Sequence, residues 1–258
     1  MLIIDSHCHL NDESFDKDRI QTLQKIRDNN MNIICSGYNL ETSKEAVNIA
    51  NNNENVFATI GVSPNDISED KEKMYSILED IEKIAKEENK VIGIGEIGLD
   101  YHWQKDNKEI QKDLFIKQIE IANRLNMPIA IHCREAYKDT IEVLRKNPVE
   151  QKGVFHCCEQ NMELIREALE VGFYISFAGP ITFKNAKNAD QIIKMVPNDK
   201  FLIETDSPYL SPEPMRGRRN DPTNVIYVAK KIADIKNLPL EKVVELAFEN
   251  TKKLYKFS

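Results

Sequence analysis

The sequence contains few of the residues that define fibrous, low-complexity or disulfide-rich proteins. Only nine of its 258 residues are glycine and ten are proline, which excludes collagen-like and low-complexity chains. Its five cysteines are odd in number and form no CxxC pair, which argues against a disulfide framework and against a cysteine-based zinc finger. These absences favour an ordinary globular protein in a reducing compartment.

Long apolar runs and an excess of positive charge are also absent. No run approaches the roughly 18 residues that span a membrane, and the N-terminus has no basic region or small-residue cleavage site of a signal peptide. We therefore expect a cytoplasmic protein without membrane contacts. The net charge is −7, whereas a protein that holds duplex nucleic acid by general charge is strongly basic. Any contact with nucleic acid must be local or assisted by bound cations.

The chain alternates short apolar runs with longer amphipathic, charged stretches. Eight apolar runs have the pattern of strands that are buried on both faces of a parallel sheet. They are Leu2–Ile4, Asn32–Ser36, Val56–Val62, Val91–Ile97, Pro128–His132, Gly153–His156, Phe173–Phe177 and Phe201–Thr205. Helical patterns lie between and after them, as in Lys71–Glu88, Glu109–Leu125, Thr223–Lys236 and Leu240–Asn250.

Eight strand–helix units in a chain of this length predict an α/β fold, a single-domain (β/α)₈ TIM barrel with extra closing helices at the C-terminus. No linker, charge block or shift in composition divides the chain, so we expect one domain over residues 1–258. A doubly wound open sheet would show the same local alternation and remains an alternative.

Polar residues gather where the predicted strands end, which is where barrels of this kind keep their chemistry. Four of the five histidines and two acids stand there: His7, His9, Glu96, His132, His156 and Asp206. A lone histidine at such a place is usually a satisfied core residue, but four of five at strand ends are hard to explain independently. A buried glutamate such as Glu96 costs several kcal/mol unless it meets a cation or a hydrogen-bond network.

These side chains predict a site for two divalent metal ions. Imidazole and carboxylate together suit transition metals, while availability in the cell keeps magnesium a candidate beside manganese and zinc. Six ligands exceed one tetrahedral site and suit two ions roughly 3.5–4 Å apart that share a bridging carboxylate. Glu96, on a middle strand, is the natural bridge.

A series of motifs extends in a fixed order over nearly the whole chain. They are Asp5-Ser6-His7-Cys8-His9-Leu10, Gly95-Glu96-Ile97-Gly98-Leu99-Asp100-Tyr101, Ile131-His132-Cys133-Arg134, His156-Cys157, Glu204-Thr205-Asp206-Ser207-Pro208-Tyr209-Leu210 and Pro214-Met215-Arg216-Gly217-Arg218-Arg219-Asn220. In this order they resemble the TatD family of metal-dependent deoxyribonucleases, within the wider group of amidohydrolase-like barrels.

The resemblance implies which residues bind each metal and which reaction follows. It assigns His7, His9, Glu96 and Asp206 to one ion, and Glu96, His132 and His156 to the other. It implies hydrolysis of DNA phosphodiester bonds, which we expect on single-stranded or frayed ends, by a metal-activated water. The sequence departs from the family at Cys158-Glu159-Gln160, where an aromatic residue or Met, a small residue and Gly are common, and this departure concerns the substrate side of the site. We expect a monomer without an obligate protein partner.

The acids divide into catalytic and supporting groups. We predict that Asp206 is both a ligand and the general base, and that Glu96 is catalytic as the bridge. Asp5 and Glu204 lie one pleat below ligands on their own strands, so we expect each to accept the second N–H of a metal-bound histidine. The alternative for both is a structural hydrogen bond at the barrel floor.

Two groups of residues are candidates for contacts with the substrate phosphates. Arginines in the loop after the eighth strand can bind phosphate with two parallel hydrogen bonds, unless one of them pairs with a nearby acid. Side chains directly after the fourth strand can stack on bases or contact phosphate, unless they only pack in the loop. The candidates are Arg216, Arg218, Arg219, His102 and Tyr101, with Trp103 as a further stacking residue.

Two other functions remain open at this point. The same metals would serve a hydrolase of another ester or amide, such as an aminoacyl-tRNA ester or a small molecule, and turnover of a small ester without turnover of DNA would identify it. A non-catalytic metal-binding or nucleic-acid-binding protein is the second alternative. Pure binding does not need Asp206 beside an open metal position, which argues against it.

Overall fold

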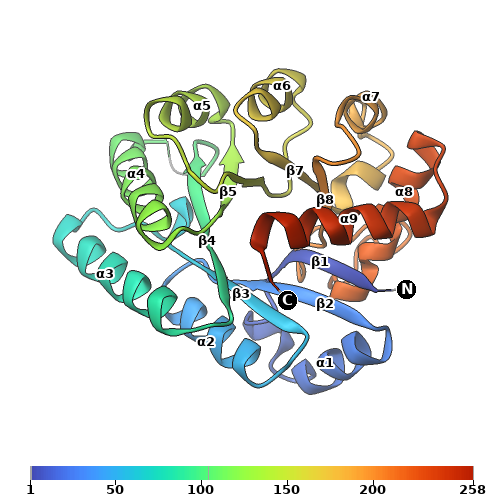
Figure 1. The fold of residues 1–258 in the computed structure, drawn as a ribbon, viewed down its shortest axis with the longest axis horizontal. Coiled ribbons are helices and arrows are strands. Elements are labelled where there is room, and N and C mark those ends of the chain that lie inside the picture. The colour runs from blue at the N-terminus through green and yellow to red at the C-terminus, as the bar shows by residue number, and fades with distance from the viewer. Residues whose placement is uncertain (1, 104, 258) are drawn as a thin grey trace.

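The computed structural model describes residues 2–103 and 105–257, and its centre is one eight-stranded parallel sheet curled into a barrel (Figure 1). The strands lie in the sheet in their order along the chain. They are β1 (Ile3–Cys8), β2 (Met31–Ser36), β3 (Val56–Ile60), β4 (Val91–Asp100), β5 (Ile129–Arg134), β6 (Gly153–Phe155), β7 (Tyr174–Phe177) and β8 (Phe201–Ile203).

The last strand returns to the first and closes the barrel. The segment after β8 runs beside β1. The Asp206 amide donates to the His7 carbonyl (3.0 Å), and the His9 amide donates to the Ser207 carbonyl (2.7 Å). An open doubly wound sheet would leave β1 inside the sheet and reverse the strand order. The barrel predicted from the sequence is therefore confirmed.

Helices cover the outside of the barrel (Figure 1). They are α1 (Arg19–Asp28), α2 (Leu40–Asn51), α3 (Lys71–Glu87), α4 (Lys108–Leu125), α5 (Tyr137–Lys146), α6 (Met162–Glu170), α7 (Ala189–Met195), α8 (Val225–Lys236) and α9 (Leu240–Tyr255). Short 3₁₀ turns occupy Glu13–Phe15, Pro64–Asp66, Gly179–Thr182 and Pro222–Asn224. None of the helices in the described ranges is both long enough and apolar enough to cross a membrane.

The barrel interior is filled at one end and open at the other. An inner cluster takes apolar side chains from all eight strands, and Leu254, Tyr255 and Phe257 pack against it. These three lie at or just after the end of α9, which crosses the end of the barrel that faces the viewer in Figure 1. Burial of this C-terminal turn explains why α9 continues to Tyr255, beyond the predicted end at Asn250. The opposite end is left for the polar residues.

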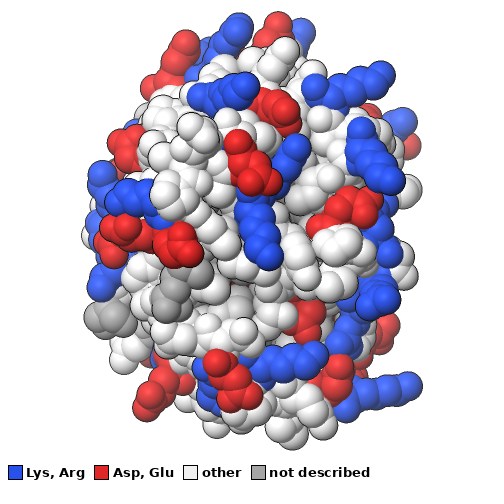
Figure 2. Space-filling model, turned by 90° about the vertical axis from the view of Figure 1, so that its right-hand side faces the viewer, with Lys and Arg blue, Asp and Glu red and all other residues white. Residues whose placement is uncertain are grey.

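Several strand ends differ from the sequence prediction. β1 continues to Cys8 and β4 to Asp100, beyond the apolar runs that stop at Ile4 and Ile97 in the sequence. Their backbone groups pair with neighbouring strands, so the polar side chains remain inside the barrel mouth. β8 is shorter than predicted and ends at Ile203, which places Asp206 in the following turn. On the outer face shown in Figure 2, cationic and anionic side chains are interspersed.

Candidate metal centre

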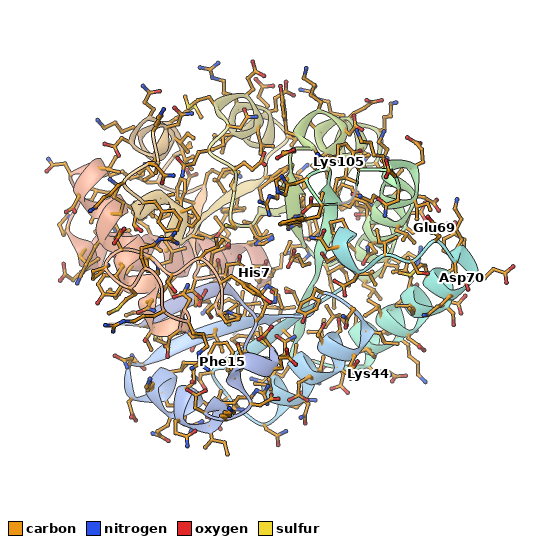
Figure 3. All side chains as sticks on the ribbon, turned by 180° about the vertical axis from the view of Figure 1, so that it is seen from behind. His7, Phe15, Lys44, Glu69, Asp70 and Lys105 are labelled. Carbon is orange, nitrogen blue, oxygen red and sulfur yellow. The ribbon has the colours of Figure 1, made fainter. Side chains whose placement is uncertain are left out.

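The six predicted ligands converge at the open end of the barrel. His7 lies within the ring of strands in the view from behind, whereas Lys44 and Asp70 project from the periphery (Figure 3). A cavity of about 520 Å³ opens above His7 and includes among its walls the other five, His9, Glu96, His132, His156 and Asp206. Each of the six is buried except His132, which is partly exposed.

One group of donor atoms surrounds Oε2 of Glu96. The Nε2 atoms of His7 and His9 lie 3.6 and 3.5 Å from this oxygen, and 3.3 Å from one another. His9 Nε2 is also 3.3 Å from Asp206 Oδ1. The Nδ1–H of His9 donates to the Ser36 carbonyl (2.9 Å), so its Nε2 lone pair faces the group. The Ser36 hydroxyl lies 3.1 Å from Nδ1 of His7 and orients that ring similarly.

The second group surrounds the other oxygen of Glu96. His132 Nδ1 lies 2.9 Å from Oε1 and His156 Nε2 lies 3.5 Å from it. His132 donates its opposite Nε2–H to Asp100 Oδ2 at 2.9 Å. The two oxygens of one carboxylate thus face two separate sets of imidazole nitrogens, which is the arrangement of a bridging ligand.

A close approach of two strands makes the second group possible. Gly98 on β4 has a φ of +141°, and a Cβ at this position would lie 2.0 Å from the His132 carbonyl oxygen. Only glycine adopts this conformation without strain and leaves room for the neighbouring backbone. Gly98 therefore lets β4 and β5 approach, with Glu96 and Asp100 facing His132.

The charges of the cluster favour a bound cation. Burial would raise the pKa of Glu96, but the charge of His156 and a hydrogen bond from His132 hold it well below its usual value. Burial also opposes charge on His132, but hydrogen bonds to Asp100 and Glu96 raise its pKa to about 9. The carboxylates thus retain their charge and draw positive charge to His9, His132 and His156, whereas burial and the neighbouring His156 lower the pKa of His7. A divalent ion at the same points would take the place of those protons, so the donor set fits metal ions.

The structure separates the two predicted supporting acids. Glu204 Oε1 lies 3.4 Å from Nδ1 of His156 and accepts the Cys157 amide at 2.6 Å, so it stands behind a predicted ligand. Asp5 instead accepts hydrogen bonds from the Thr205 amide (2.9 Å) and hydroxyl (2.5 Å). Asp5 therefore fixes the turn before Asp206, which is the structural role that the sequence left as the alternative.

Two supporting residues were missed by the sequence analysis. Ser36 ends β2 and contacts the Nδ1 atoms of both His7 and His9. Asp100 ends β4 and accepts a hydrogen bond from His132. Burial raises the pKa of Asp100, but the hydrogen bonds from His132 and the Trp103 amide outweigh it and lower the pKa to about 2. Asp100 lies four residues after Glu96 on one strand, and this even spacing was the available signal.

The predicted substrate contacts are engaged elsewhere or lie outside the cavity. Arg219 forms two hydrogen bonds to Asp18 (2.8 and 2.6 Å), and Arg216 lies over the Phe183 ring with its guanidinium carbon 3.9 Å from the centroid. Among the described residues, the cavity walls include none of Arg216, Arg218 and Arg219. The reason is local, because this loop packs against the Glu13–Phe15 turn, Asp18 just before α1, and the Gly179–Thr182 turn.

The two candidates after β4 also bind protein groups. His102 Nδ1 lies 2.6 Å from Glu135 Oε1, and the Tyr101 hydroxyl donates to Asp139 at 2.7 Å. The neighbouring Trp103 is 66% exposed and does form part of the cavity wall. Of Tyr101, His102 and Trp103, only Trp103 is therefore in position for a substrate.

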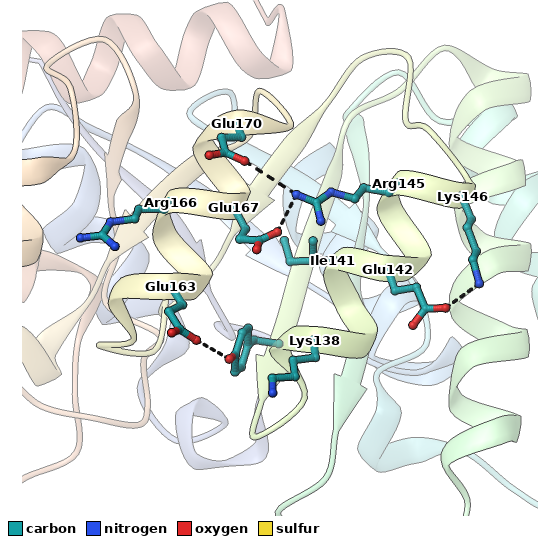
Figure 4. Close-up of a pocket in the computed structure, with 10 residues that line it drawn as sticks. Lys138, Ile141, Glu142, Arg145, Lys146, Glu163, Arg166, Glu167 and Glu170 are labelled. Carbon is teal, nitrogen blue, oxygen red and sulfur yellow. Dashed lines mark hydrogen bonds and ion pairs between the residues drawn. The ribbon is translucent and has the colours of Figure 1, made fainter.

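A second cavity of about 710 Å³ lies on the outer helices, between α5 and α6 (Figure 4). Several of its charged groups pair with one another. Arg145 lies 2.7 Å from Glu167 and 3.7 Å from Glu170, and Lys146 lies 2.5 Å from Glu142. We refer to this cavity as the α5–α6 groove. It is larger than the barrel cavity, but the described residues that line it contain no convergent set of metal ligands.

Comparison with known proteins agrees with this fold and donor set. The family model described as TatD related DNase matches residues 4–256. The chain is 37% identical over 259 residues to the uncharacterized metal-dependent hydrolase YabD of Bacillus subtilis, with 100% of both chains covered. It is 35% identical over 260 residues to the uncharacterized metal-dependent hydrolase YcfH of Escherichia coli K12, covering 99% of this chain and 96% of that one.

Solved structures share the whole architecture. The crystal structure of YJJV, a TatD homolog from Escherichia coli K12, aligns with a TM-score of 0.91 over 99% of this chain and 98% of that chain, at 24% identity. A TatD family hydrolase from Entamoeba histolytica aligns with a TM-score of 0.87 over 98% and 97% of the two chains, also at 24% identity. By its family model and by relatives that match it from end to end, the chain belongs to the TatD family of metal-dependent hydrolases.

Proposed function

We propose that this hydrolase cleaves phosphodiester bonds of DNA, releasing nucleotides from the end of a single strand. The observation that carries the proposal is the position of Glu96, whose two carboxylate oxygens face two separate groups of imidazole nitrogens. Two cations held a few ångströms apart suit displacement at phosphorus, because they neutralise the attacking and the leaving oxygens. The description of the matching family model as a DNase supports DNA as the substrate.

In this proposal the two metal sites share Glu96. His7, His9 and Asp206 would hold one ion together with Glu96, and His132 and His156 would hold the other with the same glutamate. Bound divalent ions would lower the pKa of water and neutralise phosphate oxygens, which is the chemistry that they supply. The protein fixes the geometry through Ser36 and Asp100, which bind the second nitrogens of His7, His9 and His132, and through Glu204, whose carboxylate lies 3.4 Å from Nδ1 of His156.

Asp206 is the proposed general base. Its carboxylate lies in the cavity wall, 3.3 Å from His9 Nε2, and its backbone follows β8 with a φ of +54°. As the water oxygen bonds to phosphorus, one water proton passes to Asp206, the bond from phosphorus to the leaving sugar oxygen breaks, and that oxygen is protonated from solvent. An asparagine tolerates the same backbone conformation, so Asp206→Asn removes the base without a change of fold.

The test uses single-stranded DNA oligonucleotides labelled at either end. The protein is stripped with chelator and supplied with magnesium, manganese or zinc in turn, with a Glu96→Ala variant as the control. We expect metal-dependent shortening from one end, none with Glu96→Ala, and retained metal without turnover in Asp206→Asn. A protein that binds two ions but hydrolyses a small ester and leaves DNA intact would overturn the proposal.

A further inference from the structure

The barrel cavity is rich in acids and poor in cations. Apart from Glu96 and Asp206, its walls include the carboxylates of Asp66 and Glu159. Arg134 is the one lysine or arginine among its described wall residues. A substrate that carries several phosphates needs positive charge beyond the metal centre, and in this cavity only Arg134 offers it.

The ring of Trp103 supports the side chain of Arg134. Arg134 ends β5, two residues after His132, and its guanidinium carbon lies 5.5 Å from the centroid of the Trp103 ring. The Trp103 amide donates to Asp100 Oδ1 (2.9 Å), while the other oxygen of Asp100 accepts from His132. One carboxylate therefore fixes both a predicted metal ligand and the aromatic platform beneath Arg134.

The acids near Arg134 are engaged with other groups. Glu135 binds His102 at 2.6 Å, and Glu159 accepts the backbone N–H of Glu135 at 2.8 Å. Within residues 2–103 and 105–257, no carboxylate oxygen lies within 4.0 Å of the Arg134 guanidinium. Its donors therefore remain available for a ligand, in contrast to those of Arg219, which are bound to Asp18.

We propose that Arg134, supported by the Trp103 ring, binds a phosphate of the substrate other than the one that is hydrolysed. Trp103 is 66% exposed at the mouth of the cavity, whereas Glu96 is 6% and His156 is 7% exposed at its base. A phosphate at Arg134 therefore lies nearer to solvent than the metal centre. A guanidinium on an aromatic face can bind phosphate with two parallel hydrogen bonds, and the exposed ring can stack on a base of the same strand.

This inference rests on the proposed function, since it specifies how that site takes a nucleic-acid strand. It predicts that the effect of replacing Arg134 depends on the number of phosphates in the substrate. Arg134→Gln should raise the KM for a ten-nucleotide single strand about tenfold, with kcat nearly unchanged. It should not alter kcat/KM for bis(p-nitrophenyl) phosphate, which has one phosphate. Arg134→Lys, which keeps the charge and loses the planar fork, should fall between Arg134→Gln and the wild type.

The salt dependence separates a phosphate contact from a structural role. Loss of one contact to a single strand should reduce the slope of log kcat/KM against log salt by about 0.7. Arg166→Gln is the matched control, because Arg166 is an exposed arginine on α6 outside the barrel cavity wall, and its slope should equal that of the wild type. Equal losses on the oligonucleotide and on bis(p-nitrophenyl) phosphate, or an unchanged slope for Arg134→Gln, would overturn the inference.

Binding distinguishes failure of the inference from failure of the proposed function. The affinity for a fluorescent ten-nucleotide strand is measured with metal-loaded Asp206→Asn, with and without Arg134→Gln. Binding that depends on Arg134, in a protein whose wild type does not cleave DNA, would retain the phosphate site and reject the nuclease. Cleavage of DNA by the wild type, with binding and KM independent of Arg134, would retain the nuclease and reject the phosphate site.

Discussion

The barrel cavity and the α5–α6 groove are both lined by charged side chains, but they use charge in opposite ways. In the groove, Arg145 is 52% exposed and pairs with Glu167, which is 37% exposed, so both charges stay solvated. In the barrel cavity, Glu96 is buried and faces four imidazole nitrogens from the ends of three strands, β1, β5 and β6. The groove is the larger of the two, at about 710 against 520 Å³. Size therefore does not indicate chemistry here, whereas burial and convergence of donor atoms do.

The comparison predicts the largest effect for the buried carboxylate that belongs to both groups of ligands. Glu96→Gln keeps the size of the side chain but removes its charge and directs an NH₂ group at one set of histidines. Loss of an outer partner of a metal ligand typically costs 10- to 100-fold, so we expect loss of the bridge to reduce kcat/KM by more than about 100-fold. Metal content after dialysis should fall by at least one ion per chain.

Glu167→Gln in the α5–α6 groove is the matched control for this variant. It changes a glutamate that also forms a short ion pair, at 2.7 Å to Arg145, but on the helix surface. We expect metal content and turnover equal to those of the wild type. Two ions and normal turnover in Glu96→Gln, or a defect of similar size in Glu167→Gln, would contradict the distinction between the two cavities.

A smaller effect is expected from the acid behind His132. In Asp100→Asn the remaining side-chain oxygen can still accept hydrogen bonds from the backbone N–H groups of His102 and Trp103, which are both 2.9 Å from Asp100 Oδ1 in the wild type. The new NH₂ group would then face His132 Nε2 and move the ring proton to Nδ1, the atom that faces Glu96. We expect metal affinity to fall about 10- to 100-fold, measured by competition with a chromophoric chelator.

Asp139→Asn provides the comparison for Asp100→Asn. Asp139 is on α5 and accepts from the Tyr101 hydroxyl, and it is not part of the barrel cavity wall. Its replacement should leave metal affinity unchanged. An affinity of Asp100→Asn within twofold of the wild type would show that the orientation of His132 does not depend on Asp100.

Ser36→Ala should have a more modest effect on the other group of ligands. It removes the hydroxyl at 3.1 Å from His7 Nδ1 but keeps the Ser36 carbonyl that accepts from His9. A neutral hydrogen bond contributes about 1 kcal/mol, which corresponds to roughly a fivefold loss of metal affinity. The same chelator competition measures it, with Ser43→Ala on α2 as a buried-serine control. An effect as large as that of Glu96→Gln would contradict a role of the Ser36 hydroxyl that is limited to the His7 ring.

The residues changed in these variants differ in whether the sequence could predict their roles. The convergence of the six predicted ligands was predictable because histidines and acids at the ends of apolar strands must meet at one end of a barrel. Ser36 was not predictable, because its contacts depend on how β1 and β2 pair, and their register shifts between Asp5 and Cys8. The partner of Arg219 was not predictable either, since Asp18 lies 201 residues away in another loop. Alternation along a strand fixes which face a side chain takes, but contacts between loops require the packed structure.

The smallest effect is expected in the α5–α6 groove, from Arg145→Ala. This variant removes the contacts to Glu167 and Glu170, but the two carboxylates stay hydrated and unpaired at little cost. Exposed pairs contribute about 0.2–1 kcal/mol, so the free energy of unfolding in urea should fall by less than about 1 kcal/mol, with turnover and metal content unchanged. Arg145→Lys, which keeps a charge near both acids, should lie between Arg145→Ala and the wild type. A tenfold loss of turnover in Arg145→Ala would mean that the groove communicates with the barrel cavity, because solvated surface charges alone cannot produce it.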